Sequence, residues 1–499
     1  MTSLPRRRFL GGVGAAAFAA SMNALASPIS ALIGQPQVAA PPGRLAFAHY
    51  MTAGLRSFDN ALTPDYYDRG YLAPGGEGGI HSTYGGWSRN RPLYRPPIKD
   101  PGLRYQIVDA MWEVATARQA GLDGFAMLMP NFQGVHVPRM DDMWTGAYLQ
   151  DPTFLIRMMP DMGGSIGNAT QAQFVECIKR YSALPNTMRL EDGRVVLSPY
   201  RPELKSVTWW DQVIAMLNSH TTNANGTTAG PVAIAFVPIM LQFTTKFHAM
   251  PWTYAVGSWG SRSPKSMNPA ASEQLGFAAG ARNAGKRWVQ CVALQQAVPH
   301  TKLYDEALGS QTLANCAQIA VNTNADWVDL ETWNDPAEGT VFYPSRNLGM
   351  VPLELWRRLG APWRAGAAWS PDDSFFVLHR PHFFDDKPSW SGYPVVDGVV
   401  RNLMVPRASS SPPADIIEVS SWFKAPTSVS ILVNDIAIAA YTAPAGYCRY
   451  VTPLAEGVIR VHASREMASR DIQAPTAVTH YPLVQDETYW GAMGILGGV

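Results

Sequence analysis

The feature that most constrains the fold is a regular alternation of short apolar runs with amphipathic segments over residues 44–367. The runs show little period-two alternation, which is typical of strands that are buried on both faces of a parallel sheet. Eight such runs can be counted, at residues 44–51, 122–129, 154–162, 195–200, 232–240, 254–260, 288–294 and 327–332.

Helical patterns lie between several of these runs. In residues 105–120, the apolar side chains Ile107, Ala110, Val114 and Ala117 form one stripe. Further helical patterns cover residues 171–181, 209–218, 270–284 and 305–321. Eight strands that alternate with helices predict an α/β fold of the (β/α)8 TIM barrel type. A doubly wound open sheet is the alternative, although no G-x-G-x-x-G follows the first run.

The character of the chain changes after about residue 368. Short strand candidates are separated by turn residues, at 416–423, 428–434, 436–441, 448–451 and 458–463. Val433-Asn434-Asp435 and Pro444-Ala445-Gly446 are predicted to be hairpin turns. We therefore expect a catalytic barrel over residues 44–367 and a C-terminal antiparallel β-sandwich-like domain over residues 368–499. This domain would serve either as a carbohydrate-binding module or, as we prefer, as a packing domain.

The N-terminus resembles an export signal. Arg6-Arg7-Arg8-Phe9-Leu10 contains the R-R-x-F-L of a twin-arginine signal. A mildly apolar run and the small-x-small pattern Ala24-Leu25-Ala26 follow, so a signal peptide is predicted over residues 1–26. Residues 27–43 are rich in proline and are predicted to be a linker. Twin-arginine signals are bacterial, and the expected location is therefore the periplasm or the extracellular space.

Two carboxylates carry the strongest indication of chemistry. Asp335 and Glu338 stand three residues apart, just beyond the last apolar run. Pro336 favours a turn after Asp335, which would place the pair on a loop at the C-terminal end of a strand. Barrel enzymes keep their catalytic residues at that end. Enzymes that cleave a glycosidic bond typically use two carboxylates that face one cleft.

The chain contains five short motifs in order: F-A-H-Y-M at 47–51, A-G-L-D-G-F-A at 120–126, M-M-P-D-M at 158–162, G-R-V-V-L-S at 193–198 and W-N-D-P-A-E at 333–338. Together these motifs resemble those of glycoside hydrolase family 71, the α-1,3-glucanases or mutanases. The resemblance covers most of residues 44–365 and includes a C-terminal β-domain. It implies an inverting endo-hydrolase of α-1,3-glucan whose acidic residues are Asp335 and Glu338.

Two departures from the family pattern concern the substrate. Pro336-Ala337 replaces the family's Tyr-Gly between the acids, and Leu294-Gln295-Gln296-Ala297 stands where S-P-W-F is expected. The resemblance to the family therefore supports the fold and the two acids more strongly than it supports the residues that bind the substrate. Another α-glucan or a different glycan is accordingly an open possibility.

Inversion needs one protonated carboxyl group and one ionised one. We assign Glu338 as the general acid and Asp335 as the base. The apolar ring of Trp333 is expected to exclude water and so to help keep the acid protonated. Asp161, at the end of the third run, is a third candidate, either as the base itself or as a binder of sugar hydroxyls. Glu331 is expected to be a buried structural carboxylate.

Further residues at strand ends are expected to bind the substrate. His49 and Tyr50 are predicted to contact hydroxyl groups, and Tyr200 and Trp259 to stack on sugar rings. The complete set of predicted binding residues is Asp161, His49, Tyr50, Trp333, Asn334, Tyr200 and Trp259. The insert at residues 64–101 is rich in proline, glycine and aromatic residues, and it is either a wall of the substrate cleft or a packing loop.

The composition narrows the class of partner. The formal net charge of +1 shows no electrostatic footprint for nucleic acid, and no stretch after the signal approaches a membrane span. No metal-ligand or phosphate-loop motif is apparent, so neither a metal nor another cofactor is predicted. The four cysteines are expected to be free thiols, with a Cys291–Cys316 bridge as the alternative.

The 16 Trp and 19 Tyr suit a polysaccharide or oligosaccharide substrate. Two other classes stay open. One is a noncatalytic glycan-binding protein on a hydrolase scaffold, and the other is a hydrolase or transglycosylase of another glycan, such as α-mannan.

Overall fold

The computed structural model describes residues 28–52, 67–93, 102–134 and 136–497. The predicted signal peptide and part of the insert at 64–101 lie outside the described residues. The chain divides into two compact units. Of the described residues, the first contains 28–42, 102–134, 136–239 and 250–254, and the second contains 43–52, 67–93, 240–249 and 255–497.

The first unit contains four buried parallel strands. Their order is β7 (Ile234–Phe236), β4 (Val195–Leu197), β3 (Leu155–Pro160) and β2 (Gly124–Met129). Its helices are α2 (Tyr105–Gln119), α3 (His136–Gln150), α4 (Gln171–Ser182) and α5 (Val207–Leu217). A capping box between Thr170 and Gln173 begins α4. Shorter elements are η1 (Pro28–Leu32), η5 (Ser165–Asn168), η6 (Pro202–Leu204), β5 (Thr221–Thr222) and β6 (Thr228–Ala229).

The second unit contributes parallel strands in the order β1 (Leu45–Tyr50), β13 (Trp327–Leu330), β10 (Arg287–Val292) and β9 (Ala255–Ser258). Because β13 pairs with a neighbour on each side, its backbone is fully satisfied and its four residues are buried. The helices of this part are α6 (Glu273–Asn283), α7 (Gln311–Asn322), α8 (Val351–Leu359) and α9 (Ala361–Ala365).

The predicted parallel α/β architecture is confirmed, but the strand count differs from eight. The apolar run at residues 232–240 forms two short strands, β7 and β8 (Ile239–Met240). Pro238 separates them because it has no N–H to donate to a ladder. The described residues therefore contain nine strands in the order of the parallel sheet. Closure into an eight-stranded barrel, and the domain boundary at residue 367, stay predictions.

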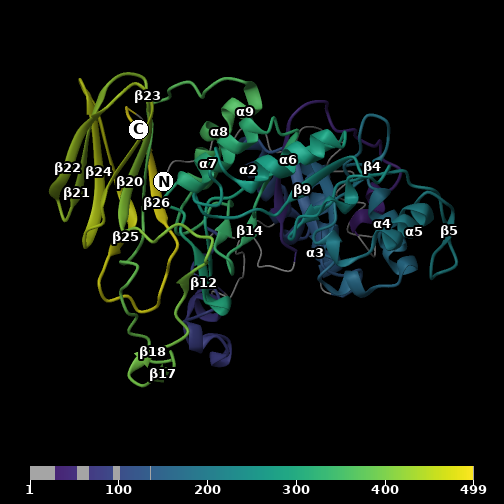
Figure 1. The fold of residues 1–499 in the computed structure, drawn as a ribbon, viewed down its shortest axis with the longest axis horizontal. Helices are drawn as coiled ribbons and strands as arrows, with labels where there is room; N and C mark the ends of the chain where they lie inside the picture. Colours follow the sequence, from purple (N-terminus) through teal and green to yellow (C-terminus); the bar gives the residue numbers. More distant parts are fainter. Residues whose placement is uncertain (1–27, 53–66, 94–101, 135, 498–499) are drawn as a thin grey trace. The chain divides into compact units, whose positions relative to one another are not determined.

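The C-terminal part of the second unit is an antiparallel sandwich, at the yellow-green end of the chain in Figure 1. One sheet has the order β23 (Gly446–Pro453), β20 (Ile416–Phe423), β16 (Ser374–His379) and β26 (Trp490–Ile495). The other has the order β22 (Ile436–Ala443), β21 (Thr427–Val433), β24 (Gly457–Arg465) and β25 (Ala468–Val478). Phe375 and Val419 of the first sheet and Ile431 and Val461 of the second share one buried core.

The two predicted hairpin turns have different outcomes. Asn434 and Asp435 both have positive φ, at 51° and 64°, and they join β21 to β22 as a two-residue hairpin. The prediction for Pro444-Ala445-Gly446 is wrong, because this turn joins β22 of one sheet to β23 of the other. The strands β16, β25 and β26 were not predicted from the sequence.

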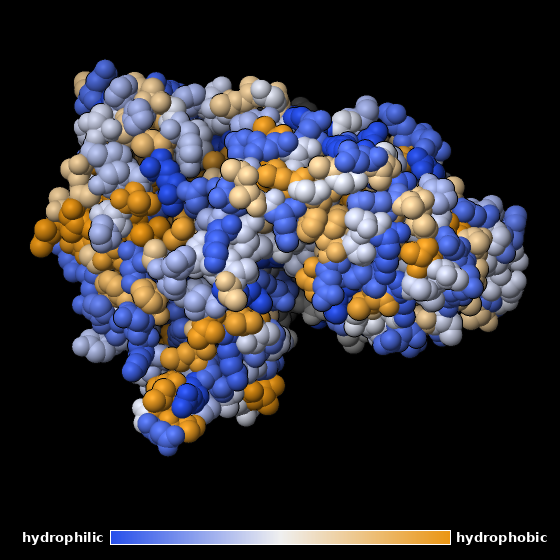
Figure 2. Space-filling model, in the orientation of Figure 1, coloured by the Kyte–Doolittle hydropathy of each residue, from blue (hydrophilic) through white to orange (hydrophobic). Residues whose placement is uncertain are grey.

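Smaller elements complete the second unit. A three-stranded sheet has the order β11 (Gln296–Val298), β12 (Leu303–Asp305) and β19 (Val405–Pro406). The hairpin of β17 (Val395–Val396) and β18 (Val399–Val400) exposes apolar side chains to solvent, as the orange surface at the bottom of Figure 2 shows. Short helices are η2 (Tyr67–Leu72), η3 (Glu77–Gly79), η4 (Ser82–Tyr84), η7 (Thr245–Phe247) and η8 (Pro299–Thr301).

The sequence also led to predictions about the cysteines and about membrane-spanning segments. All four cysteines are free thiols, so the alternative Cys291–Cys316 bridge is not formed. Within the described residues, none of the helices combines the length and apolar character needed to cross a membrane.

Candidate active site

The two predicted acids lie on a tight hairpin directly after the buried strand β13. The hairpin consists of β14 (Asn334–Asp335) and β15 (Thr340–Val341). The N–H of Glu338 donates to the carbonyl of Asp335 over 3.2 Å, and the N–H of Gly339 donates to that of Pro336 over 3.2 Å. The predicted turn at Pro336 is therefore confirmed, as is its position beyond the C-terminal end of a parallel strand.

The backbone of this turn is held from two sides within the second unit. The hydroxyl of Ser88 donates to the carbonyl of Pro336 over 2.8 Å, and the N–H of Ala297 donates to the carbonyl of Glu338 over 2.9 Å. Gly339 has a φ of 69°, and a Cβ there would approach the backbone of Ala297 to 3.1 Å. Glycine is required at this position, since a side chain would be strained and would press the turn away from its support.

Asp335 occupies an environment that favours its protonated form. It is half-buried, and its pKa is raised well above the usual value for an aspartate. The larger cause is shielding from water, and the next is the negative charge of Glu338. Two backbone N–H groups, of Ala337 and Glu338, act in the opposite direction but do not cancel these effects. The two carboxyl groups therefore influence each other electrostatically.

Glu338 is held by a neutral donor. The amide Nε2 of Gln296, the first residue of β11, donates to Oε2 of Glu338 over 2.7 Å. This hydrogen bond fixes the position of the Glu338 carboxyl group. Gln296 belongs to the stretch that departs from the family pattern, and its role was not predicted from the sequence. The contact joins residues 42 positions apart, which no local pattern reveals.

The residues beside the acids hold the turn in place, and the substrate contacts predicted for Trp333 and Asn334 stay predictions. The side chain of Trp333 is fully buried, and the backbone N–H of this residue donates to the backbone carbonyl of His49 over 2.7 Å. The side chain of Asn334 imitates a backbone pairing with Met51: its Oδ1 accepts from the Met51 N–H over 2.7 Å and its Nδ2 donates to the Met51 carbonyl over 3.3 Å. Asn334 thus ties the end of β1 to the start of the acidic turn.

His49, at the end of β1, is completely buried in the described structure. Its Nε2 lies 3.0 Å from Oδ2 of Asp329, a residue of β13 that was not predicted. Its ring stacks on Trp259, with ring centroids 4.8 Å apart and planes 8° from parallel. Tyr50 and Trp259 are 9% and 8% exposed. The substrate contacts assigned to these three residues stay predictions.

A buried ion pair lies behind the acidic turn. Nη2 of Arg262 is 2.6 Å from Oε2 of Glu331, and the two side chains are 3% and 1% exposed. Nη1 of Arg262 also donates to the carbonyls of Trp259 and Gly260, over 3.0 and 3.2 Å. Burial raises the pKa of Glu331 well above its usual value, and the charge of Arg262 opposes this shift. Glu331 is thus buried and ion-paired, as the expectation of a structural carboxylate requires.

The insert after β1 supplies a stack of rings on the side of Glu338. Trp87 stacks on His300 with centroids 4.7 Å apart and planes at 14°, and His81 lies 4.8 Å from the same Trp87 ring. Nε2 of His81 is 2.9 Å from Oε2 of Glu77. Burial lowers the pKa of His300, while the negative charge of Glu338 opposes this effect. His300 follows β11, and no sequence signal had marked it.

Asp161 and Tyr200 belong to the first unit and are paired there. They form a parallel bridge, in which the N–H of Met162 donates to the carbonyl of Tyr200 over 3.0 Å. Oδ1 of Asp161 accepts from the N–H of Gly163 over 2.9 Å. Burial raises the pKa of Asp161 above its usual value, against the influence of the Gly163 N–H and Arg201. Their roles toward a substrate stay predictions.

The C-terminal sandwich holds the loop that carries Gln296. The N–H of Tyr489 donates to Oε1 of Gln295 over 2.7 Å, and the hydroxyl of Tyr489 donates to Glu306 over 2.9 Å. Glu306 also forms a buried ion pair with Arg380. These contacts support the packing role that was preferred for this domain. In the part of the chain that is described, no group of three or more His, Cys, Asp or Glu residues is placed to hold a metal ion.

Comparison with known proteins leaves the family open. No family model matches the chain, and no curated protein matches it. Membership of family 71 therefore stays a prediction.

Among solved structures, the chain is similar to an endo-alpha-mannosidase of family GH99 from Bacteroides thetaiotaomicron, with 12% identity, a TM-score of 0.43, and coverage of 64% of this chain and 97% of that one. It is also similar to an FMN-binding beta-glucuronidase from Faecalibacterium prausnitzii, with 8% identity, a TM-score of 0.41, and coverage of 78% and 56%. A modular endo-beta-1,4-mannanase from Cellulomonas fimi has 10% identity, a TM-score of 0.31, and coverage of 73% and 89%. At these scores the likeness leaves the activity of this chain open.

Proposed function

We propose that the protein is a glycoside hydrolase that uses Asp335 and Glu338 to cleave an α-linked glucan. The observation that carries the proposal is the contrast between two carboxyl groups on one turn. Asp335 is shielded and has a raised pKa, whereas Glu338 accepts a hydrogen bond from Gln296. A pair of carboxyl groups whose environments differ in this way is what acid and base assignments require.

The environments favour the reverse of the roles assigned from the sequence. Asp335, held protonated, donates its proton to the glycosidic oxygen as the bond from that oxygen to the anomeric carbon breaks. Glu338, whose carboxyl group is oriented by the hydrogen bond from Gln296, accepts a proton from a water molecule whose oxygen attacks the anomeric carbon. After one turnover Asp335 is ionised and Glu338 is protonated, and exchange with solvent restores both. Inversion of the anomeric centre follows the resemblance to family 71.

The substrate class rests on the same resemblance. The motif at residues 333–338 and the four that precede it are those on which the α-1,3-glucan expectation was based. The N-terminal motif supports the further proposal that the protein acts after export from a bacterial cell.

Reducing-sugar release from insoluble α-1,3-glucan tests this function. A panel of α-1,4-glucan, α-1,6-glucan, β-1,3-glucan and α-mannan runs beside it. Asp335→Asn and Glu338→Gln are each expected to lose activity by about 10²-fold or more. Glu273→Gln changes an exposed carboxyl group at the start of α6 and serves as the matched control. Activity that survives in both acid variants, or its absence from wild type on every glycan, rejects the proposal.

A further inference from the structure

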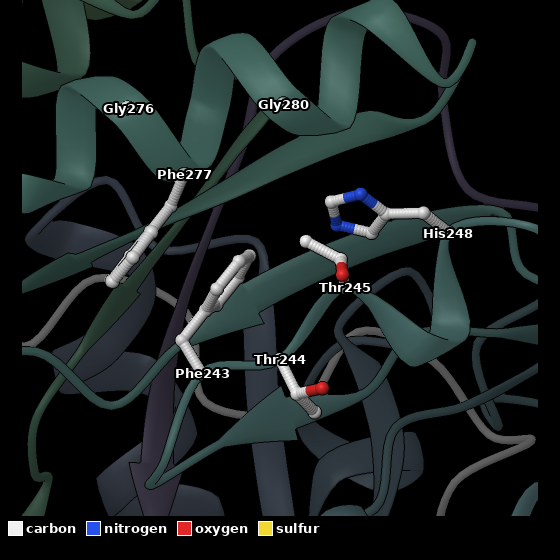
Figure 3. A pocket seen from close by; sticks show the side chains of 7 residues that line it. All are labelled: Phe243, Thr244, Thr245, His248, Gly276, Phe277 and Gly280. Atoms are coloured by element: carbon white, nitrogen blue, oxygen red, sulfur yellow. The ribbon is translucent and has the colours of Figure 1, made fainter.

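A second concave site lies in the second unit, between the segment that follows β8 and helix α6. It is a pocket of about 370 Å³, and its lining residues are shown in Figure 3. None of them belongs to the acidic turn or contacts it through the interactions described above. We refer to it as the α6 pocket and define it by Phe243, Thr245, His248, Gly276 and Phe277, with Gly280 at its back.

The walls of the α6 pocket are aromatic, and one side lacks side chains. The rings of Phe243 and Phe277 are parallel, with centroids 4.0 Å apart and planes at 11°. Gly276 and Gly280 stand one turn apart on α6 and therefore share a face of the helix. A Cβ on Gly276 would meet nothing within 4 Å. Glycine is unfavourable inside a helix, and here its effect is to keep the space beside the phenylalanines empty.

A buried polar atom is available at this site. His248 is 9% exposed, and its Nε2 is shielded from solvent and has no hydrogen-bond partner among the described residues. The ring extends from η7 toward Phe243 and α6 in Figure 3. Burial, together with the charge of Lys286, lowers the pKa of His248, so the imidazole is neutral at pH 7. A buried polar atom without a partner is costly unless a ligand or water pairs with it.

The chemistry of the α6 pocket indicates its ligand. The lining residues include no carboxylate, lysine or arginine, which disfavours a charged ligand. An aromatic ring face suits the C–H face of a pyranose ring, and a neutral imidazole suits a hydroxyl group at the ring edge. We infer that the α6 pocket binds one neutral pyranose residue of a glycan, an assignment of ligand class that rests on the proposed function.

The position of the α6 pocket makes it a separate site rather than a subsite of the acidic turn. Phe243 meets the ring of Trp288 edge-on, with centroids 6.1 Å apart, and Trp288 is the second residue of β10. The acidic turn follows the other end of β13, which runs parallel to β10. The ring contact of the α6 pocket is thus with the start of β10, whereas the acidic turn lies beyond the end of β13. A pyranose held in the α6 pocket would anchor a polysaccharide without touching the carboxyl groups of the turn.

Filling the pocket tests this inference. The parent is the full-length Asp335→Asn/Glu338→Gln double variant, which binds without cleaving. Its affinity is measured by isothermal titration with oligosaccharides of α-1,3-, α-1,4- and α-1,6-linked glucose and of α-linked mannose. Gly276→Leu places a side chain into the empty space of the α6 pocket. Ala279→Leu adds the same side chain at an exposed position of α6 outside the pocket and is the matched control.

We expect the parent to bind at least one oligosaccharide at two sites, and Gly276→Leu to weaken one of them by about tenfold or more. Ala279→Leu should leave both unchanged. Equal binding by the parent and Gly276→Leu overturns the inference, as does absence of binding by the parent to every oligosaccharide. The cleavage assay on the wild-type protein tests the proposed function separately. If Gly276→Leu weakens binding but the wild-type protein cleaves no glycan, the α6 pocket is supported and the proposed hydrolase is rejected.

Discussion

The buried pair of Arg262 and Glu331 offers a quantitative test of how the acidic turn is supported. Arg262→Met removes the partner of a carboxylate that is 1% exposed and leaves the Trp259 and Gly260 carbonyls without their donor. Breaking a buried pair from one side costs about 3–5 kcal/mol, because the remaining charge is uncompensated. We expect a loss of this size in the free energy of unfolding at pH 8, measured by urea denaturation with tryptophan fluorescence.

The pH dependence of this loss has a definite sign. The pKa of Glu331 is raised in the folded state, so the folded chain binds this proton more tightly than the unfolded chain does. The associated stability is present at low pH and is lost as pH rises from about 4 through the folded pKa. Arg262 opposes the shift, so Arg262→Met raises the pKa of Glu331 further. The difference between variant and wild type should therefore shrink between pH 8 and pH 5.

A double-mutant cycle completes the test. Glu331→Gln removes the charge and, combined with Arg262→Met, should recover most of the lost stability. About 1–2 kcal/mol should remain lost, because the carbonyls of Trp259 and Gly260 still lack their donor. Additive losses in the double variant, or a loss below about 1 kcal/mol for Arg262→Met alone, would refute the reasoning, since neither is compatible with a coupled buried pair.

Three further predictions concern the turn itself. Asn334→Ala should cost about 2–4 kcal/mol in thermal or urea unfolding, because the N–H and carbonyl of Met51 lose their partners. Asn334→Asp should not recover this loss, because it keeps the acceptor but places a buried carboxylate against the Met51 carbonyl. Gln296→Leu should lower kcat on the glycan substrate with little change in KM, because the carboxyl group of Glu338 loses the donor that positions it; an unchanged kcat would remove Gln296 from the mechanism. In wild type, the alkaline limb of the pH–rate profile should lie well above the pH range in which an ordinary aspartate titrates, because activity requires protonated Asp335. A loss of activity that is already complete at about pH 5 would contradict this.

Much of the parallel architecture could be predicted because its signal is local. Buried parallel strands appear as short apolar runs, and seven of the eight runs correspond to one strand each, among them β1 and β13. The eighth run contains Pro238, which cannot donate to a ladder and divides the run into β7 and β8. The acidic turn was also predictable, since Pro336 and the preceding strand are adjacent in sequence to both acids.

The electrostatics of the site could not be predicted because its determinants are distant in sequence. Gln296 reaches Glu338 from the start of β11, and Arg262 reaches Glu331 from the segment after β9. The shielding of Asp335 and the hydrogen bond from Gln296 to Glu338 distinguish the two catalytic carboxyl groups, so the order of their roles depended on the folded environment. His300 was missed for the same reason: it reaches the insert through its stacking on Trp87.

The most direct test of the central claim compares two substrates that differ in how much the leaving group needs a proton. The glycan requires protonation of its glycosidic oxygen, whereas a dinitrophenyl glycoside of the same sugar does not. Initial rates of both are measured for wild type, Asp335→Asn and Glu338→Gln. We expect Asp335→Asn to lose activity on the glycan while it retains most of its activity on the dinitrophenyl glycoside, and Glu338→Gln to lose both. The opposite pattern would make Glu338 the acid, and undiminished glycan cleavage by both variants would place the chemistry elsewhere in the molecule.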